Sequence, residues 1–178
     1  MVIPLLLGIG LMWIPVGMLL LGKGEAKSTG ALTMMVGTLT MVGAIFQATF
    51  LGDPIVAGLL FAYGFFYNIT GYVLYTGQTD LRTAGNASIA VGLITIVYII
   101  LFLTGGPVLA DGTQLWARSN FLALACAGYL VLYIMCWLAD YGKFSLKTLG
   151  WSLIIWTFVG LWAPAFWLAA TAGLPMGP

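Results

Sequence analysis

Histidine is absent from this chain of 178 residues, and charged side chains make up only 6% of it. Soluble domains carry about a quarter charged residues, so water is not the main solvent of this protein. Without histidine, and with its few carboxylates scattered singly, the sequence lacks the parts of common metal sites and of hydrolytic triads. We therefore expect no metal site, no cofactor, no catalytic residues and no enzymatic activity, and we expect no nucleic-acid partner.

Cysteine is scarce as well. The two cysteines, Cys126 and Cys136, lie ten residues apart in one apolar stretch. A helix turns by about 100° per residue, so the two thiols point to different faces and a disulfide between them is not expected. The first ten residues are apolar but lack the basic region and the cleavage site of a signal peptide. We interpret them as the start of a retained first span.

Apolar residues are abundant, at 62% of the chain. A membrane span needs about 20 of them in a row. Six stretches between the charged clusters meet this need, at residues 2–22, 29–51, 55–76, 87–104, 116–138 and 148–172. The sequence thus predicts an all-α integral membrane protein, a single domain over residues 1–178 built as a bundle of six transmembrane helices.

Turn residues connect the spans, and Ser28 or Thr29 is placed to cap the second helix.

Basic residues predict how the spans are oriented. The basic residues on one side are Lys23, Lys27, Arg82, Lys143 and Lys147, and the opposite side has only Arg118. Because basic loops stay in the cytoplasm, both termini are expected outside. We expect a multi-pass protein of the bacterial cytoplasmic (inner) membrane, surrounded by lipid.

The second predicted helix carries a stripe of small and polar residues. Its members follow each other by four and three residues and so share one helix face: Thr33, Gly37, Thr40, Ala44 and Gln47. One interpretation is close helix packing, with the polar groups bonded to a neighbouring helix. The other is that Gln47 meets a permeating polar solute at membrane depth.

The third predicted helix carries an aromatic stripe. Phe61, Phe65, Asn68 and Tyr72 share one face at the same kind of spacing. The aromatic residues taken singly are common in helix packing. Asn68 needs a partner or water, because an unpaired amide in hydrocarbon is costly.

Ionisable residues are missing from the central parts of the predicted spans. Carriers driven by protons or ions usually keep a charged group at that depth. The sequence therefore favours passive movement of a small neutral solute. Three tryptophans, Trp13, Trp156 and Trp162, lie nearer the middle of the membrane than an interfacial belt explains.

Five short motifs carry a resemblance to a known family. In chain order they are Lys27-Ser28-Thr29 with Val36-Gly37, Gly58-Leu59-Leu60-Phe61 with Phe65-Phe66-Tyr67, Asp80-Leu81-Arg82, Gly142-Lys143-Phe144-Ser145, and Trp162-Ala163-Pro164-Ala165-Phe166. They occur in the right order on six spans. The chain resembles the AmiS/UreI family of urea and short-chain amide channels over nearly its whole length.

The resemblance implies a fold and a set of site residues. It implies six helices per protomer, outward-facing termini, a homohexamer in which each protomer has its own pore, and a functional link to a cytoplasmic urease or amidase. The residues expected along the pore, with the polar candidates included, are Leu6, Trp13, Gln47, Phe61, Phe65, Asn68, Tyr72, Phe121, Leu124, Gly128 and Trp162.

The sequence also departs from the family pattern. The fifth helix offers Phe121, Leu124 and Gly128 where members of the family commonly carry tryptophans, and Trp13 stands where they can carry an aliphatic residue. Trp156 occupies a position where a glutamate is frequent. These changes leave open which amide permeates.

The leading hypothesis is a passive channel for small neutral planar solutes such as urea or acetamide, without acid gating by histidine. The alternative is a membrane assembly or anchor subunit without transport activity, which predicts that the polar stripes are buried in helix contacts and that no continuous path exists. An exporter lacks the deep carboxylate that it would need, and a membrane-embedded enzyme lacks an acid, a base or metal ligands.

Overall fold

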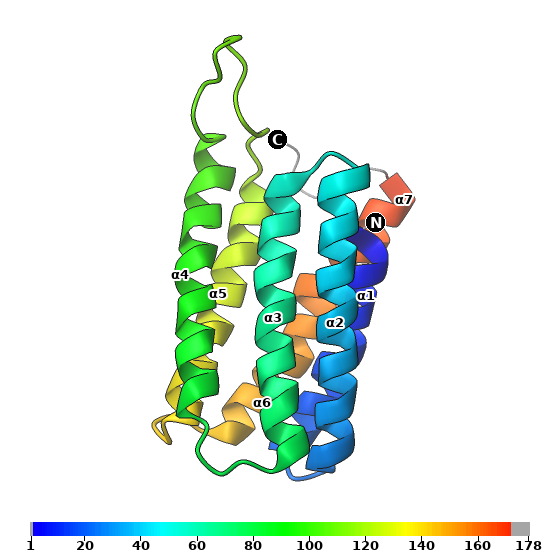
Figure 1. Ribbon diagram of the computed structural model, residues 1–178, viewed down its shortest axis with the longest axis vertical. Coiled ribbons are helices and arrows are strands. Elements are labelled where there is room, and N and C mark those ends of the chain that lie inside the picture. The colour runs from blue at the N-terminus through cyan, green and yellow to red at the C-terminus, as the bar shows by residue number, and fades with distance from the viewer. Residues whose placement is uncertain (1, 172–178) are drawn as a thin grey trace.

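The computed structural model describes residues 2–171, which are helical along most of their length (Figure 1). The helices are α1 (Val2–Leu20), α2 (Ala26–Phe50), α3 (Pro54–Thr76), α4 (Arg82–Thr104), α5 (Asn120–Asp140), α6 (Leu146–Trp156), the π-helix η1 (Thr157–Trp162) and α7 (Ala163–Thr171). Six segments of the described chain are long and apolar enough to cross a membrane, and the last of them is Leu146–Thr171. The predicted six spans are confirmed, although Ala172, the expected end of the last one, lies outside the described residues.

Several helices have different limits from those expected, and α4 and α5 differ most. α4 begins at Arg82, about one turn earlier than the sequence indicated. α5 begins at Asn120 instead of residue 116, because the Ser119 side chain accepts the N–H of Leu122 at 3.2 Å and so caps the helix there. The same helix continues to Asp140, past the expected end at residue 138. The last turn of this span therefore includes a carboxylate.

Glu25 caps α2, and the expected cap at Ser28 or Thr29 is wrong. The two carboxylate oxygens of Glu25 accept the N–H groups of Lys27 and Ser28 at 2.7 and 2.6 Å. Hydrogen bonds from Ser28 and Lys27 lower the pKa of Glu25. The helix consequently starts at Ala26, three residues before the stretch that hydropathy alone marked as apolar.

Glycines bring α2 and α3 into close contact, and the two helices lie side by side (Figure 1). A Cβ added to Gly37 would lie 2.8 Å from the carbonyl oxygen of Gly64, and one added to Gly71 would lie 2.7 Å from that of Gly30. Such backbone approach is how helices associate in a membrane, where the hydrophobic effect does not drive them together.

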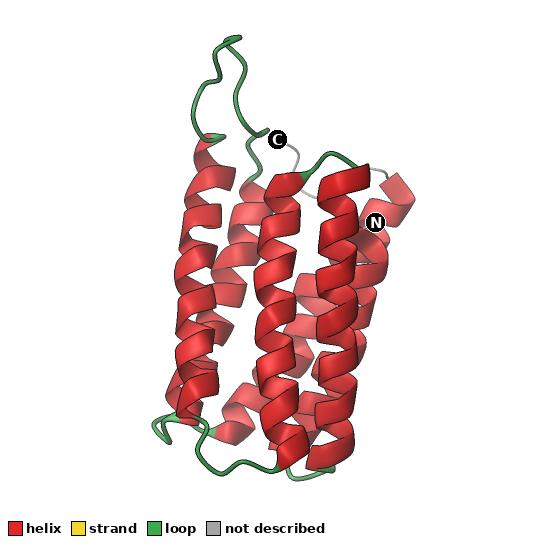
Figure 2. Ribbon diagram, in the orientation of Figure 1, coloured by secondary structure: helices red, strands yellow, loops and turns green. Residues whose placement is uncertain are grey.

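The bundle has two different ends (Figure 2). We call one the basic end, because the five residues Lys23, Lys27, Arg82, Lys143 and Lys147 lie in or next to its connections. We call the other the hairpin end, because the connection 105–119 protrudes there and carries an antiparallel bridge between Val108 and Gln114. The first turn of α1 and the last turn of α7 also lie at the hairpin end (Figure 1).

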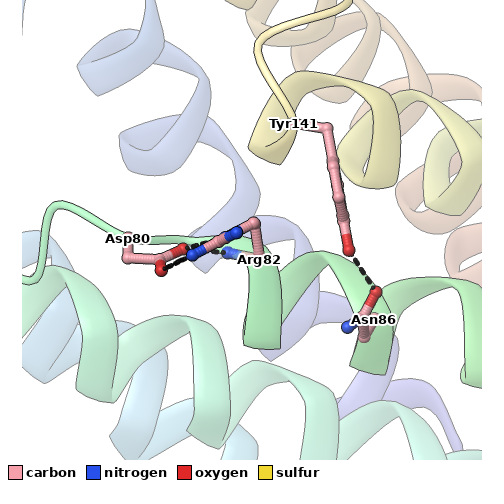
Figure 3. A network of polar contacts seen from close by, with 4 residues as sticks. All are labelled: Asp80, Arg82, Asn86 and Tyr141. Carbon is pink, nitrogen blue, oxygen red and sulfur yellow. Dashed lines mark hydrogen bonds and ion pairs between the residues drawn. The ribbon is translucent and has the colours of Figure 1, made fainter.

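Polar contacts at the basic end tie its connections together (Figure 3). The Arg82 guanidinium donates from Nε to a carboxylate oxygen of Asp80 at 2.9 Å. Hydrogen bonds from Arg82 lower the pKa of Asp80 to about 2. The Tyr141 hydroxyl donates to Oδ1 of Asn86 at 2.8 Å and links the end of α5 to the start of α4.

Candidate functional site

Two cavities lie inside the bundle, one after the other along its axis. The larger has a volume of about 110 Å³ and is lined from α1, α3, α4, α5 and the last span by Leu6, Ile9, Val56, Leu59, Leu60, Tyr63, Tyr67, Phe102, Phe121, Leu122, Ala125, Cys126, Tyr129, Gly160, Leu161, Pro164 and Leu168. The smaller, of about 30 Å³, is lined by Trp13, Phe66, Tyr67, Tyr129, Leu132, Tyr133, Cys136 and Leu153. A cavity of the larger size has room for several water-sized molecules.

Tyr67 and Tyr129 line both cavities and therefore separate them. Along α1, Leu6 and Ile9 face the larger cavity and Trp13 faces the smaller one, so the larger cavity is nearer the hairpin end. The smaller cavity is nearer the basic end. They follow each other between α1, α3, α5 and the last span, and we call the two cavities together the passage.

Aromatic rings make up the wall where the two cavities meet. The Tyr129 ring packs edge-to-face against Trp13, with centroids 6.0 Å apart, and against Tyr63, with centroids 5.7 Å apart. Tyr133 contacts Tyr63 and Phe66 at centroid distances of 5.2 and 5.3 Å. Edge-to-face contacts of this kind stabilise pairs of rings and hold them at fixed angles. The wall is uncharged, and it is apolar except for hydroxyl groups.

The hydroxyl of Tyr129 is held by the last span. It donates to the carbonyl oxygen of Gly160 at 2.7 Å. In an α-helix that carbonyl would accept the N–H of residue 164, but residue 164 is a proline and has none. The missing donor coincides with the π-helix η1, and the exposed carbonyl instead receives the tyrosine hydroxyl. Pro164 thus has a structural role in positioning Tyr129.

The hydroxyl of Tyr63 is bonded as well. Its hydroxyl lies 3.2 Å from Oγ1 of Thr95, and the Thr95 hydroxyl also lies 2.8 Å from the carbonyl of Val91. Both groups are buried. The bond turns the Tyr63 hydroxyl towards α4, so this ring presents mainly its apolar face to the passage.

Three of the residues expected along the pore line the cavities. Leu6 and Phe121 line the larger cavity, and Trp13 lines the smaller one. The indole of Trp13 is buried, with 6% of the residue exposed. Its place in the wall of the smaller cavity explains why Trp13 lies at mid-membrane depth.

The aromatic stripe on α3 lies elsewhere. Phe61, Phe65 and Tyr72 are 40%, 54% and 54% exposed and line neither cavity. Their face points outwards, because Tyr63 and Tyr67 on the opposite face turn inwards. Asn68 lies at the contact with α2, where it accepts the hydroxyl of Thr38 at 3.1 Å and donates to the Gly64 carbonyl at 3.0 Å.

The expected stripe on α5 is also displaced. Leu124 is 58% exposed, and Gly128 lines neither cavity but an external groove. The cavities are instead lined by Leu122, Cys126, Tyr129 and Tyr133, at the same spacing of four, three and four residues. The ring of Trp156 covers Gly128, where an added Cβ would lie 1.9 Å from it. A tryptophan from the last span thus occupies the space that a side chain at position 128 would take.

The two remaining candidates are Gln47 and Trp162, and they line neither cavity. Gln47 is buried on α2 and donates from Nε2 to Asp53 at 2.9 Å, while Thr33 and Thr40 on the same stripe bond to their own helix. Trp162 packs against Gly10, and its Nε1 lies 3.4 Å from the carbonyl of Leu7. The small residues of the α2 stripe agree with helix packing, but its threonines bond within α2 and not to the neighbouring helix as expected.

Four tyrosines that the sequence reasoning missed are central to the site. They pair at spacings of four residues, Tyr63 with Tyr67 and Tyr129 with Tyr133. A tyrosine at membrane depth needs a hydrogen-bond partner or a polar space for its hydroxyl. Two such pairs on different spans were the available signal for the face of α3 and α5 that turns inwards.

A six-span bundle with an uncharged aromatic passage inside one protomer is the architecture of a membrane channel or transporter of neutral solutes. The model of the AmiS/UreI family transporter matches residues 1–171, so the chain belongs to this family. The family resemblance expected from the sequence motifs is confirmed. A search of curated protein sequences gave no match.

Two solved structures have the same fold. The cryoEM structure of the Helicobacter pylori urea channel in its closed state superimposes with a TM-score of 0.82 at 22% identity, covering 98% of this chain and 100% of that one. The crystal structure of the urea channel from the same pathogen gives a TM-score of 0.79 at 24% identity, with the same coverage. Family and structural neighbours are transporters and channels, not enzymes.

Proposed function

We propose that this protein is a passive channel for urea, acetamide or other short-chain amides in the bacterial cytoplasmic membrane. The observation that carries the proposal is the pair of successive cavities inside one protomer, both lined by Tyr67 and Tyr129. Family membership supports the solute class. The basic end would face the cytoplasm by the positive-inside rule, which puts the hairpin end and both termini outside.

The passage would select solutes by shape and by the cost of removing water. Flat uncharged molecules can slide between ring faces, and rings replace little of the hydration of an ion. The rings of Tyr67 and Tyr129 would have to turn slightly to join the two cavities, so the solute would cross at this point one molecule at a time.

Assembly and physiological link belong to the same proposal. Each protomer of a homohexamer would have its own passage, and the solute would serve a cytoplasmic urease or amidase. The exposed aromatic face of α3, with Phe61, Phe65 and Tyr72, is then available to contact lipid or a neighbouring protomer. The alternative, an anchor subunit without transport, agrees with the polar contacts of Asn68 and Gln47 at the helix contacts but would leave the cavities unused.

Stopped-flow swelling of proteoliposomes tests the proposal. Wild-type protein should raise the permeability to urea and acetamide well above that of protein-free liposomes, and that to glycerol less. Tyr67→Trp, which enlarges a side chain between the cavities, should lower urea flux several-fold. Phe65→Trp is the matched control, because Phe65 lies two residues away on the outer face. Wild-type flux equal to the lipid background would favour the anchor subunit.

A further inference from the structure

Thr70, on α3, has an unusual hydrogen-bonding state. Threonines inside helices often bond to the carbonyl four residues earlier, and Thr95 and Thr157 do so here, both at 2.8 Å. The hydroxyl of Thr70 is buried and has no hydrogen-bond partner within residues 2–171. A buried hydroxyl without a protein partner needs one from outside the chain, such as water or a solute.

The position of Thr70 places it on the face of α3 that lines the passage. It follows Phe66 by four residues and Tyr67 by three, and both of these line the smaller cavity. Residues three and four apart are neighbours on a helix surface. Thr70 is therefore one turn nearer the basic end than the smaller cavity.

Asp140, the last residue of α5, has a corresponding position. It follows Cys136 by four residues and Tyr133 by seven, and both of these line the smaller cavity. Seven residues make almost two complete helical turns, so Asp140 returns to nearly the same face. Its side chain is half-buried and close enough to the Cys136 thiol to interact with it electrostatically.

The surroundings of Asp140 do not stabilise its charge. A carboxylate at the C-terminus of a helix faces the negative end of the helix dipole. Within the described part of the chain Asp140 makes no hydrogen bond and no ion pair, whereas Asp80 at the same end is paired with Arg82. The Cβ of Asp140 packs close to Gly85 of α4, while its unpaired carboxylate at the end of the span is available to a ligand.

The two side chains lie at similar heights in the bundle. α3 and α5 both run from the hairpin end to the basic end, and the rings of Phe66 and Tyr133 are in contact with centroids 5.3 Å apart. Four residues further along each helix come Thr70 and Trp137. Asp140 is three residues beyond, or about 4.5 Å at 1.5 Å per residue. The hydroxyl and the carboxylate are thus within one helical turn in height.

We propose that Asp140 and Thr70 form a binding site for primary amides at the basic end of the passage. A carboxylate is an acceptor with two oxygens and takes two parallel N–H groups from the edge of urea opposite its oxygen, or one N–H from the NH₂ of an amide. The threonine hydroxyl donates to the amide oxygen. The site rests on the proposed function, and it adds to that function a preference for solutes with N–H donors.

Flux measurements on variants test the site. Asp140→Asn keeps the shape and removes the charge, and it should lower urea and acetamide permeability at least fivefold while changing glycerol permeability less than twofold. Thr70→Val should act in the same direction with a smaller loss, and Asp140→Glu should restore part of the amide flux. Asp80→Asn is the matched control and should leave all three fluxes unchanged, because Asp80 is an exposed acid at the same end.

The outcomes separate this site from the channel function. Wild-type liposomes that conduct neither urea nor acetamide would overturn both proposals. A conducting wild type with an unchanged Asp140→Asn would overturn the site alone. Equal losses for amides and glycerol in every variant would also overturn it, since they would mean that the substitutions only disturb the fold.

Discussion

At the scale of single residues, Tyr129 is the side chain on which most contacts of the passage depend. Its ring touches Trp13, Tyr63 and Trp156, and its hydroxyl is fixed to the Gly160 carbonyl at 2.7 Å. Because Tyr129 lines both cavities, any freedom of this ring changes the narrowest part of the passage.

Tyr129→Phe should loosen the ring without removing it. The loss of one internal hydrogen bond should destabilise the protein by about 0.5–1.5 kcal/mol, and the Gly160 carbonyl loses a donor. We expect the ratio of urea to glycerol flux to fall several-fold in stopped-flow assays. An unchanged ratio would mean that the hydroxyl does not help to define the passage.

Pro164→Ala tests whether the missing N–H of the proline leaves the Gly160 carbonyl free to position Tyr129. Alanine restores an N–H that can pair with the Gly160 carbonyl in an α-helix, so it should compete with the Tyr129 hydroxyl. We expect a lower selectivity for urea over glycerol while thermal stability stays equal or rises. Selectivity identical to that of the wild type would show that the proline does not act through Tyr129.

At the scale of elements, α2 and α3 form the most closely packed pair. Gly64→Ala places a Cβ 2.7 Å from the carbonyl of Gly37, which is backbone and cannot move aside cheaply. Overpacking of this kind costs about 1–3 kcal/mol. We expect a lower melting temperature in detergent for Gly64→Ala. Gly8→Ala is the control, since nothing lies within 4 Å of an added Cβ there, and it should melt like the wild type.

The inward faces of α3 and α5 show how far sequence reasoning could go. The sequence analysis followed the stripe of α3 with Phe61 and Phe65 and missed the one with Tyr63 and Tyr67, whose hydroxyl groups were the local signal for the inward face. In water the apolar stripe would be the buried one, but in a membrane the outer surface is apolar as well. The choice was settled by the glycines that place α2 against α3 and by the bond from Tyr63 to Thr95.

At the scale of the whole molecule, the acids of the hairpin end bear on the response to pH. The chain has no histidine, and the connection 105–119 offers only Asp111 as an acid. Hydrogen bonds from the Thr113 side chain and backbone lower the pKa of Asp111. A lowered pKa means that the ionised carboxylate stabilises the folded protein. This stabilisation is complete above the ordinary pKa of an Asp and is lost as the pH falls through the lowered pKa. Asp111 therefore stays ionised between pH 7 and 5.

Solute flux should consequently be nearly independent of the pH on the hairpin side between 7 and 5. The measurement uses vesicles of uniform orientation with the pH on the basic side clamped at 7, and a leak control at each pH. Asp53 at this end accepts bonds from Gln47 and from the Val56 N–H and belongs to the helix cap. A reversible several-fold rise on acidification would identify another sensor, and Asp111→Asn and Asp53→Asn are the variants that would locate it.

Native mass spectrometry addresses the assembly. The proposed homohexamer should appear as a six-protomer species in mild detergent, with each protomer keeping its own passage. Since the two cavities lie within one chain, the flux per protomer should not depend on the number of protomers. Finding only monomers and dimers in several detergents would contradict the hexamer and leave the passage itself in place.

The sequence by itself determined that the chain spans a membrane, how often it crosses, and that no charge lies midway along any span. These properties follow from the length and composition of each segment. Each helix must be long and apolar enough to cross the bilayer and must satisfy its own backbone hydrogen bonds. Only the tertiary structure decided which face of each helix turns inwards. That choice depends on contacts between residues far apart in the chain, such as Trp156 on Gly128 and Tyr129 on Gly160. It also brought Thr70 and Asp140 to the same end of the passage, because α3 and α5 run in the same direction and both residues lie near the ends of these helices.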